Sequence, residues 1–266
     1  MHGIRAFDAG RVIDWGKTAD DYATHRPGPP PQFYALLQAW GIGHAGQRLL
    51  DVGTGTGLLA RQFARHGAQV TGTDSAAGQI KAARAAAEAE ALNVDFRVAA
   101  TEALPFVDDS FDAVTAMQCW LYFDAERASR EVTRVLAPGG ALVTAHFSWL
   151  PRRDAIAHAS EALVLAHNPD WGGADWPGEI PSAPRWSEGR FEVAGMFWFD
   201  APIAFTRESW RGRIRACRGI GATLDADAVA RFDAEHTALL ERCAPEDFAV
   251  LHRIDAHLLR PLASSQ

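Results

Sequence analysis

The sequence has few cysteines, no long apolar run and no excess of basic charge, and each shortage excludes a class of protein. Its three cysteines, Cys119, Cys217 and Cys243, lack the spacing of a metal motif, and their odd number suits reduced thiols. No apolar run approaches the roughly 20 residues that span a bilayer, and residues 1–20 contain no apolar signal segment. With 33 acidic against 26 basic residues, the overall charge does not favour nucleic acid. We therefore expect a cytoplasmic protein that binds neither membrane nor nucleic acid.

What the sequence does contain is a strand, a glycine-rich turn and a helix in succession. Arg48–Val52 has the composition of a buried strand, and residues 58–66 have apolar side chains at helical spacing. Three glycines, at positions 53, 55 and 57, lie between them. Further strands and helices alternate as far as residue 147, which predicts a parallel sheet with right-handed crossovers. In such a sheet, ligands bind at turns that follow the strands.

The spacing of the glycines argues against a dinucleotide. The dinucleotide fingerprint is G-x-G-x-x-G, whereas this turn reads G-x-G-x-G and has Leu58 at the sixth position. Asp51, just before the turn, would repel a pyrophosphate but can hold an ammonium group. Asp74, at the end of the next strand, can accept both hydroxyls of a ribose. A nucleoside with a cationic, amino-acid-like tail fits these groups, and S-adenosylmethionine has that shape.

Four segments resemble the class I S-adenosylmethionine-dependent methyltransferases, in the order and at the spacing of that family. They are LLDVGTGTG (49–57), VTGTD (70–74), TEALPFVDDSFDAV (101–114) and REVTRVLAPGGALV (130–143). The resemblance is closest to the small-molecule branch that includes the ubiquinone- and menaquinone-biosynthesis methyltransferases. It implies an α/β fold with a doubly wound, mostly parallel seven-stranded sheet, an inserted cap and a final antiparallel strand, here at 248–259.

We expect the chain to divide into four parts. An N-terminal helical cover occupies residues 1–45, the cofactor-binding core 46–149, an inserted cap 150–190, and the rest of the sheet with its helices 191–266. The second half of the cap is rich in proline and glycine, but its three tryptophans argue against disorder. A long loop of this kind is typical of a lid over a binding site.

The residues and the resemblance together give a set of expected cofactor ligands. By resemblance, Tyr22 and Arg26, in the segment before the first strand, lie near the methionine carboxylate. Relatives usually carry an aspartate where this chain has Ala100, so Thr101, Glu102 or backbone groups are left to bind the adenine. The full set is Tyr22, Arg26, Asp51, Gly53, Thr54, Gly55, Gly57, Asp74, Ser75, Thr101, Glu102 and Gln118.

Aromatic side chains dominate the segments that should meet above the carboxyl ends of the strands, and they favour a flat, apolar or electron-rich substrate. The expected substrate contacts are Tyr22, Trp120, Tyr122, Phe123, Trp149, His167, Trp171 and Trp176. His146 and His25 are the candidate general bases, because imidazole titrates near neutral pH. A metal set of His146, His158, His167 and Asp170 is an alternative, but it matches no standard motif and we expect no metal.

These features predict methyl transfer from S-adenosylmethionine to a small, largely apolar or aromatic metabolite, with carbon or oxygen as the favoured acceptor. Such a pocket would suit specialised metabolism. The alternatives are methylation of a small-molecule nitrogen, an NAD(P)-dependent oxidoreductase and a non-catalytic protein that retains the fold. A nucleic-acid methyltransferase is disfavoured, because Gln118 to Leu121 replaces the N/D-P-P-Y-type loop that base methylation uses.

Overall fold

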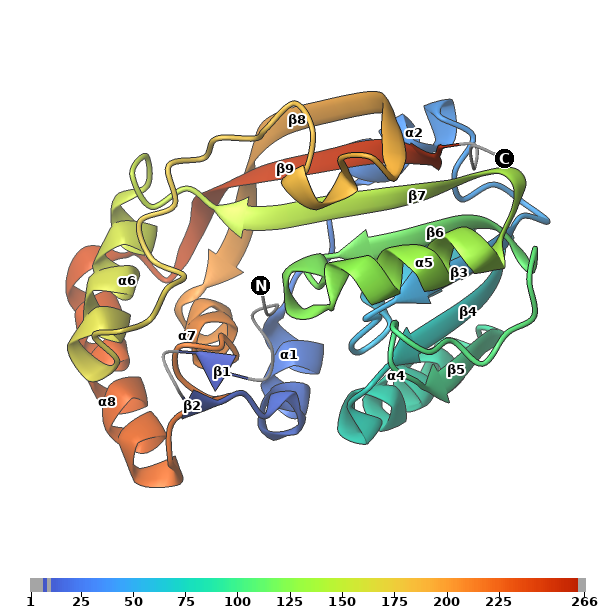
Figure 1. Ribbon diagram of the computed structural model, residues 1–266. Coiled ribbons are helices and arrows are strands. Elements are labelled where there is room, and N and C mark those ends of the chain that lie inside the picture. Colours follow the sequence, from blue (N-terminus) through green and yellow to red (C-terminus); the bar gives the residue numbers. More distant parts are fainter. Residues whose placement is uncertain (1–6, 9–10, 263–266) are drawn as a thin grey trace.

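The computed structural model of the chain describes residues 7–8 and 11–262, and its centre is a seven-stranded sheet (Figure 1). The strands are β3 (Arg48–Val52), β4 (Gln69–Asp74), β5 (Val94–Val98), β6 (Phe111–Met117), β7 (Leu136–Trp149), β8 (Phe191–Thr206) and β9 (Asp247–Pro261). Their order is β5-β4-β3-β6-β7-β9-β8. Neighbours from β5 to β7 run parallel, while β9 is antiparallel to β7 and β8. The predicted mostly parallel sheet with an antiparallel last strand is confirmed.

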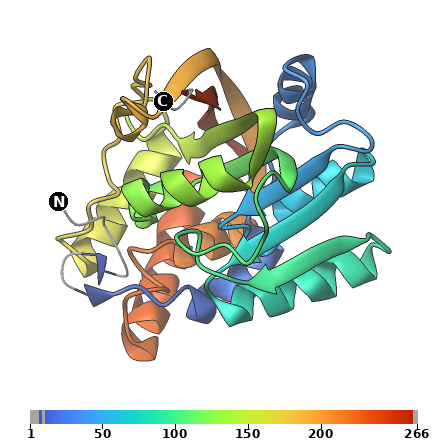
Figure 2. The same ribbon diagram turned by 45° about the vertical axis from the view of Figure 1, so that its right-hand side comes forward.

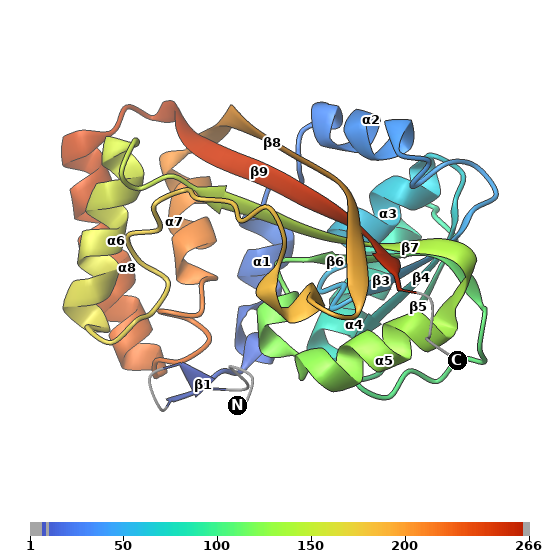
Figure 3. The ribbon, with the colours of Figure 1, turned by 45° about the horizontal axis from the view of Figure 1, so that its top comes forward.

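The core has two apolar layers, one on each face of the sheet. Successive strand residues point to opposite faces, so Leu49 lies in one layer and Leu50 in the other. The first layer is covered by α2 (Pro31–Ala39), α3 (Leu58–Arg65) and α4 (Ala77–Ala89), and the second by α5 (Ala125–Val135). Figure 3 shows α2 and α3 on one side of the strands and α5 on the other. In Figure 2 the sheet rises from β5 near the bottom to the long β8 and β9 at the top.

A third apolar cluster lies beyond the carboxyl ends of β6 and β7, where their arrowheads point in Figure 1. It is built by α6 (Ala155–His167), α7 (Arg207–Arg215) and α8 (Ala226–Cys243) around the fully buried Trp210 and Phe232. Next to α7 lies α1 (Ala19–His25), which follows a short 3-10 helix, η1 (Trp15–Thr18). The expected cap, residues 150–190, contributes only α6 of these helices, because α7 and α8 are inserted between β8 and β9.

The remaining elements are short: β1 (Phe7–Asp8), β2 (Arg11–Val12), η2 (Trp120–Tyr122) and η3 (Arg185–Ser187). Residues 1–6, 9–10 and 263–266 belong to the first and last of the four expected parts and lie outside the described residues. Within the described ranges, no helix combines the length and the apolar composition that a membrane crossing requires.

His252, on β9, is a buried histidine whose protonation should weaken the fold. Its ring lies among those of Phe147, Trp149 and Phe205, and its Nδ1 is 2.9 Å from the carbonyl oxygen of Val250. Burial lowers the pKa of His252 to about 3. In an unfolded chain the pKa of histidine is about 6.5, so between these values only the unfolded state binds the proton. Stability is therefore lost as the pH falls below about 6.5.

We expect the free energy of unfolding to fall, relative to that of His252→Asn, by about 1.4 kcal/mol for each pH unit between about pH 6 and 4. Asparagine keeps a donor for the Val250 carbonyl but cannot take up the proton. Urea unfolding of both proteins at several pH values measures the difference. His44→Asn, at an exposed position, is the control and should leave the pH dependence unchanged. Parallel curves for the wild type and His252→Asn would contradict a buried, neutral His252.

Candidate active site

The glycine turn after β3 is tied to β4 by hydrogen bonds from its own backbone. The Thr54 amide donates to the carbonyl oxygen of Thr73 at 2.9 Å, and the Gly55 amide donates to Oδ2 of Asp74 at 3.0 Å. The other oxygen of Asp74 accepts the Ala76 amide at 2.8 Å. The Asp74 carboxylate therefore organises both strand ends, and each of its oxygens keeps a lone pair for a ligand. Burial raises the pKa of Asp74.

All three glycines of the turn have the left-handed backbone, with φ of +60° at Gly53, +55° at Gly55 and +75° at Gly57. Two of them are also in close contact with side chains. A Cβ on Gly53 would lie 2.6 Å from Cβ of Cys119, and one on Gly57 would lie 2.6 Å from the Phe96 ring. Glycine is needed at these two positions for space as well as for conformation.

Asp51 is a buried carboxylate beside this turn. It accepts the hydroxyls of Thr54 at 2.6 Å and Thr115 at 2.7 Å. Burial raises the pKa of Asp51 to about 6, because these two hydrogen bonds only partly replace the lost water. Asp51 also lines a small hollow of about 40 Å³ together with Tyr22, Arg26 and the start of the glycine turn. A cation in this hollow would be stabilised by the carboxylate.

The N-terminal segment covers the glycine turn. Gln79, on α4, donates to the carbonyl oxygen of Trp15 at 2.9 Å and so fixes η1 over the start of α4. The next helix, α1, brings the Tyr22 ring beside Gly55, where an added Cβ would be 3.7 Å from it. The Arg26 guanidinium carbon lies 4.6 Å from the centroid of the Tyr22 ring. The predicted pair Tyr22 and Arg26 thus lies over the turn.

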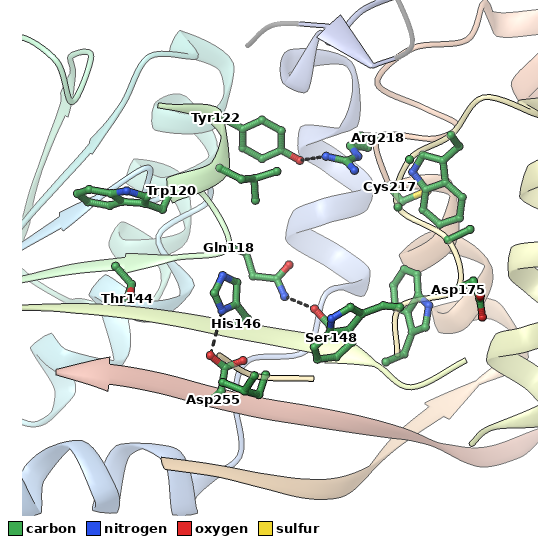
Figure 4. A pocket seen from close by; sticks show the side chains of 18 of the residues that line it. Gln118, Trp120, Tyr122, Thr144, His146, Ser148, Asp175, Cys217, Arg218 and Asp255 are labelled. Carbon is green, nitrogen blue, oxygen red and sulfur yellow. Dashed lines mark hydrogen bonds and ion pairs between the residues drawn. The ribbon is translucent and has the colours of Figure 1, made fainter. Parts of the chain in front are cut away.

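The other expected cofactor ligands have different surroundings. Thr101 is buried, and Ser75 is exposed at the end of β4. Glu102 accepts the Asp124 amide at 2.8 Å, so one of its oxygens supports the start of α5. Gln118 has a φ of +60° and donates to the Ser148 hydroxyl at 2.9 Å. That conformation turns Gln118 into the large cavity beyond the strand ends (Figure 4).

This large cavity has a volume of about 590 Å³ and lies between the ends of β6 and β7, the segment 171–186, α1, α7 and β9. Six of the eight expected substrate residues line it: Tyr22, Trp120, Tyr122, Trp149, Trp171 and Trp176. The other two do not line it. Phe123 packs against Trp120 and the Gly53 position, and His167 lies 3.2 Å from a carboxylate oxygen of Glu235. A cavity of this size and aromatic content fits a small, flat molecule.

His146 faces the cavity from β7 and is held by a carboxylate from the neighbouring strand. The antiparallel register places it opposite Asp255 on β9, and its Nδ1 lies 3.0 Å from Oδ2 of Asp255. The side chain of Asp255 is 0% exposed, and that of His146 is 42% exposed. When Nδ1–H donates to Asp255, Nε2 is left as an acceptor. In Figure 4 the His146 ring points to Asp255, and a dashed line joins the two side chains.

The second oxygen of Asp255, Oδ1, is buried and has no hydrogen-bond partner among the described residues. His25, the other candidate base, lies elsewhere. Its ring fills the space beside Gly212 of α7, and it is not among the residues that line the cavity. Only His146 of the two is therefore placed to meet a substrate.

Sequence reasoning missed several residues that line the cavity: Trp15, Ser148, Glu161, Trp186, Arg213, Asp255 and His257. Asp255 and His257 had a signal, because they are polar positions within the apolar strand that contains Ile254, Ala256 and Leu258. Across the described part of the chain, no three His, Cys, Asp or Glu side chains are grouped so as to hold a metal ion.

Comparison with known proteins agrees with this geometry. Residues 50–144 match the family model described as a methyltransferase domain. A demethylmenaquinone methyltransferase from Thermus thermophilus is 46% identical over 111 residues, which cover 41% of this chain and 50% of the relative. A ubiquinone biosynthesis O-methyltransferase from Xanthomonas oryzae pv. oryzae is 34% identical over 178 residues, or 64% of this chain and 71% of the relative. The chain thus spans only about half the length of the Thermus relative.

A solved structure is similar over most of the chain. It is an S-adenosylmethionine-dependent methyltransferase from Thiobacillus denitrificans in complex with S-adenosyl-L-homocysteine, with a TM-score of 0.51 and 21% identity. The match covers 93% of this chain and 98% of that one. The fold and the glycine turn define an α/β protein that binds a nucleoside at the ends of its parallel strands. The chain belongs to the class I S-adenosylmethionine-dependent methyltransferases.

Proposed function

We infer that this chain transfers the methyl group of S-adenosylmethionine to a hydroxyl oxygen of a small aromatic metabolite. The observation that carries this inference is His146, whose Nδ1 lies 3.0 Å from the buried carboxylate of Asp255 and whose ring borders an aromatic cavity. A base at this position is useful for a hydroxyl acceptor, because the oxygen must lose its proton as it is methylated. The name of the Xanthomonas relative, which is an O-methyltransferase, supports the same acceptor.

The residues of the glycine turn fit the cofactor. Asp74 has lone pairs left for ribose hydroxyls, and the buried Asp51 suits the ammonium of the methionine tail. Arg26, which borders the hollow next to Asp51, suits the carboxylate of that tail. When bound, the cofactor supplies an electrophilic methyl group, whose bond to sulfur breaks as the bond to the acceptor forms. The chain orients the two reactants, which can contribute roughly 7–11 kcal/mol to lowering the barrier.

His146 then has one defined task, the removal of a proton. Its Nε2 accepts the proton of the acceptor hydroxyl, and the Asp255 carboxylate stabilises the imidazolium that results. Trp120 and Trp186, whose rings stack at 4.1 Å between centroids, offer the acceptor ring a flat apolar wall. The segment that contains Trp171 and Trp176 completes the wall and reduces the access of water.

Replacing Asp74 by alanine should weaken the affinity for S-adenosylmethionine about ten- to a hundredfold. Such a loss corresponds to hydrogen bonds to a charged group, which contribute about 1.5–3 kcal/mol. Calorimetric titration of both proteins with S-adenosylmethionine measures it. Asp95→Ala, on the neighbouring strand β5 in an exposed pair with Arg97, should leave the affinity unchanged. Equal affinities of Asp74→Ala and wild type would remove Asp74 from the ribose site.

The function itself is tested with S-adenosylmethionine labelled in its methyl group. The protein is incubated with fractionated cell extract and, separately, with a panel of simple phenols and catechols. We expect label in small organic-soluble products whose new methyl group is an ether by mass spectrometry and NMR, and inhibition by S-adenosylhomocysteine. Label on a ring carbon would show that carbon, and not oxygen, accepts the methyl group. Label in protein or RNA would refute the proposal.

A further inference from the structure

Arg213, on α7, is a buried cation that lines the large cavity and has no anionic partner. It is 7% exposed. It makes no hydrogen bond or ion pair with any residue for which the structure gives side-chain positions. Its guanidinium carbon lies 4.7 Å from the centroid of the Trp149 ring. A buried charge without a partner is costly to a fold, so its presence beside a cavity needs an explanation.

The neighbouring arginines of the same helix are paired. Arg211 binds Asp233 at 2.5 Å, and Arg215 binds both Asp233 at 2.7 Å and Asp21 at 2.5 Å. The groups whose charges act most on Arg213 are instead Arg26, the Tyr22 phenol and the Cys217 thiol. Arg26 and Arg213 thus line the same cavity, and none of the groups whose charges act most on Arg213 is a carboxylate. Burial and Arg26 lower the pKa of Arg213, but a guanidinium keeps its proton near neutral pH.

The two arginines border different spaces. Arg26 lines both the small hollow at the glycine turn and the large cavity, whereas Arg213 lines only the large cavity. The carboxylate of the cofactor belongs at the glycine turn, within reach of Arg26. Arg213 is therefore left for a second anion in the acceptor site. The Trp149 ring holds its guanidinium plane in place, which suits two parallel hydrogen bonds to a carboxylate.

Four carboxylates of the protein line the cavity, those of Glu161, Asp175, Glu179 and Asp255, and none of them pairs with Arg213. Glu179 is exposed, and its charge acts on Arg152. Glu161 accepts the Trp149 indole N–H at 2.5 Å and the Asp175 amide at 2.7 Å. Asp175 also pairs with Arg152 at 2.7 Å, and Asp255 binds His146. The charge of Arg213 thus has to be balanced by something that enters the cavity.

We propose that the methyl acceptor is an aromatic hydroxy acid whose carboxylate binds Arg213 while its hydroxyl is directed to His146. This inference rests on the proposed function, since it takes the large cavity as the acceptor site. It also alters the substrate class, because a largely apolar acceptor would leave Arg213 unpaired. The aromatic walls bind the ring, and the two polar groups at different positions of the cavity fix its orientation.

Binding of matched ligands tests the proposal without requiring turnover. The protein is saturated with S-adenosylhomocysteine and titrated calorimetrically with hydroxybenzoate, hydroxyphenylacetate and hydroxycinnamate, each next to its own carboxamide. We expect at least one acid to bind about ten- to a hundredfold more tightly than its amide. In Arg213→Gln this preference should disappear, and in Arg213→Lys it should persist in part. Arg211→Gln, on the same helix, should retain the full preference.

Two further measurements distinguish the possible roles of Arg213. The affinity for S-adenosylhomocysteine should be the same in Arg213→Gln and wild type, and a loss there would assign Arg213 to the cofactor instead. The melting temperature of ligand-free Arg213→Gln should be equal or higher, because a buried unpaired charge is removed; a marked fall would indicate a purely structural role. Absence of any acid preference also overturns the proposal. Tight binding of an acid that is never methylated would refute the proposed function only.

Discussion

Replacing His146 by alanine should lower kcat for methyl transfer about a hundred- to ten-thousandfold, the range that a general base contributes. The reason is geometric. Its Nδ1 is held 3.0 Å from Asp255, and its ring borders the cavity in which the acceptor is proposed to bind. The affinity for S-adenosylmethionine should not change, because His146 is not among the residues around the glycine turn and its hollow. Initial rates with saturating cofactor, together with calorimetric titration, separate the two effects.

Asp255→Asn should lower activity through its effect on His146. It tests whether Asp255 acts by positioning that histidine. The amide has no charge to stabilise an imidazolium, so kcat should fall while KM for the acceptor stays nearly constant. His44→Ala, at an exposed position outside the cavity, should leave kcat unchanged. Added imidazole should restore part of the rate of His146→Ala, since the cavity of about 590 Å³ has room for it. Full activity of His146→Ala would place proton removal elsewhere or make it unnecessary.

Gly53→Ala should reduce the affinity for S-adenosylmethionine more than a hundredfold. A left-handed backbone costs an alanine about 1–2 kcal/mol, and Gly53 has a φ of +60°. Gly53 is the first residue of the turn, and a Cβ added to it would lie 2.6 Å from Cβ and 2.8 Å from Sγ of Cys119. Cys119 cannot move easily, because it is buried and its thiol donates to the Val52 carbonyl at 3.2 Å. The turn itself must therefore shift.

Gly41→Ala separates backbone strain from the steric clash. Gly41 has a φ of +77°, but a Cβ there meets no atom within 4 Å. Both variants should lose some thermal stability, whereas only Gly53→Ala should lose the cofactor in a calorimetric titration. Normal cofactor affinity of Gly53→Ala would mean that Cys119 adapts and that the turn is less constrained than the contacts indicate.

The sequence by itself predicted the mostly parallel sheet and pointed to the turn after β3 as the expected cofactor site, because both inferences depend on local patterns. The alternation of strands and helices predicted the parallel sheet, and the glycine spacing with Asp51 and Asp74 indicated a ligand-binding turn. Capping is equally local: Asp124 is the N-cap of α5, and its carboxylate accepts the Arg127 amide at 3.2 Å. These residues lie within one βαβ unit or one helical turn, so their chemistry can be read from short spacings.

Only the tertiary structure decided which residues line the proposed acceptor site, because they lie far apart in the chain. His146 and Asp255 meet through the antiparallel pairing of β7 and β9, a register that no local spacing encodes. Arg213 was one arginine among several on its helix, and only the packing of α7 left it buried and unpaired beside the cavity. The same packing seated His25 against Gly212, away from the cavity. The surroundings of each side chain that lines the cavity are set by long-range contacts, which depend on how the whole chain packs.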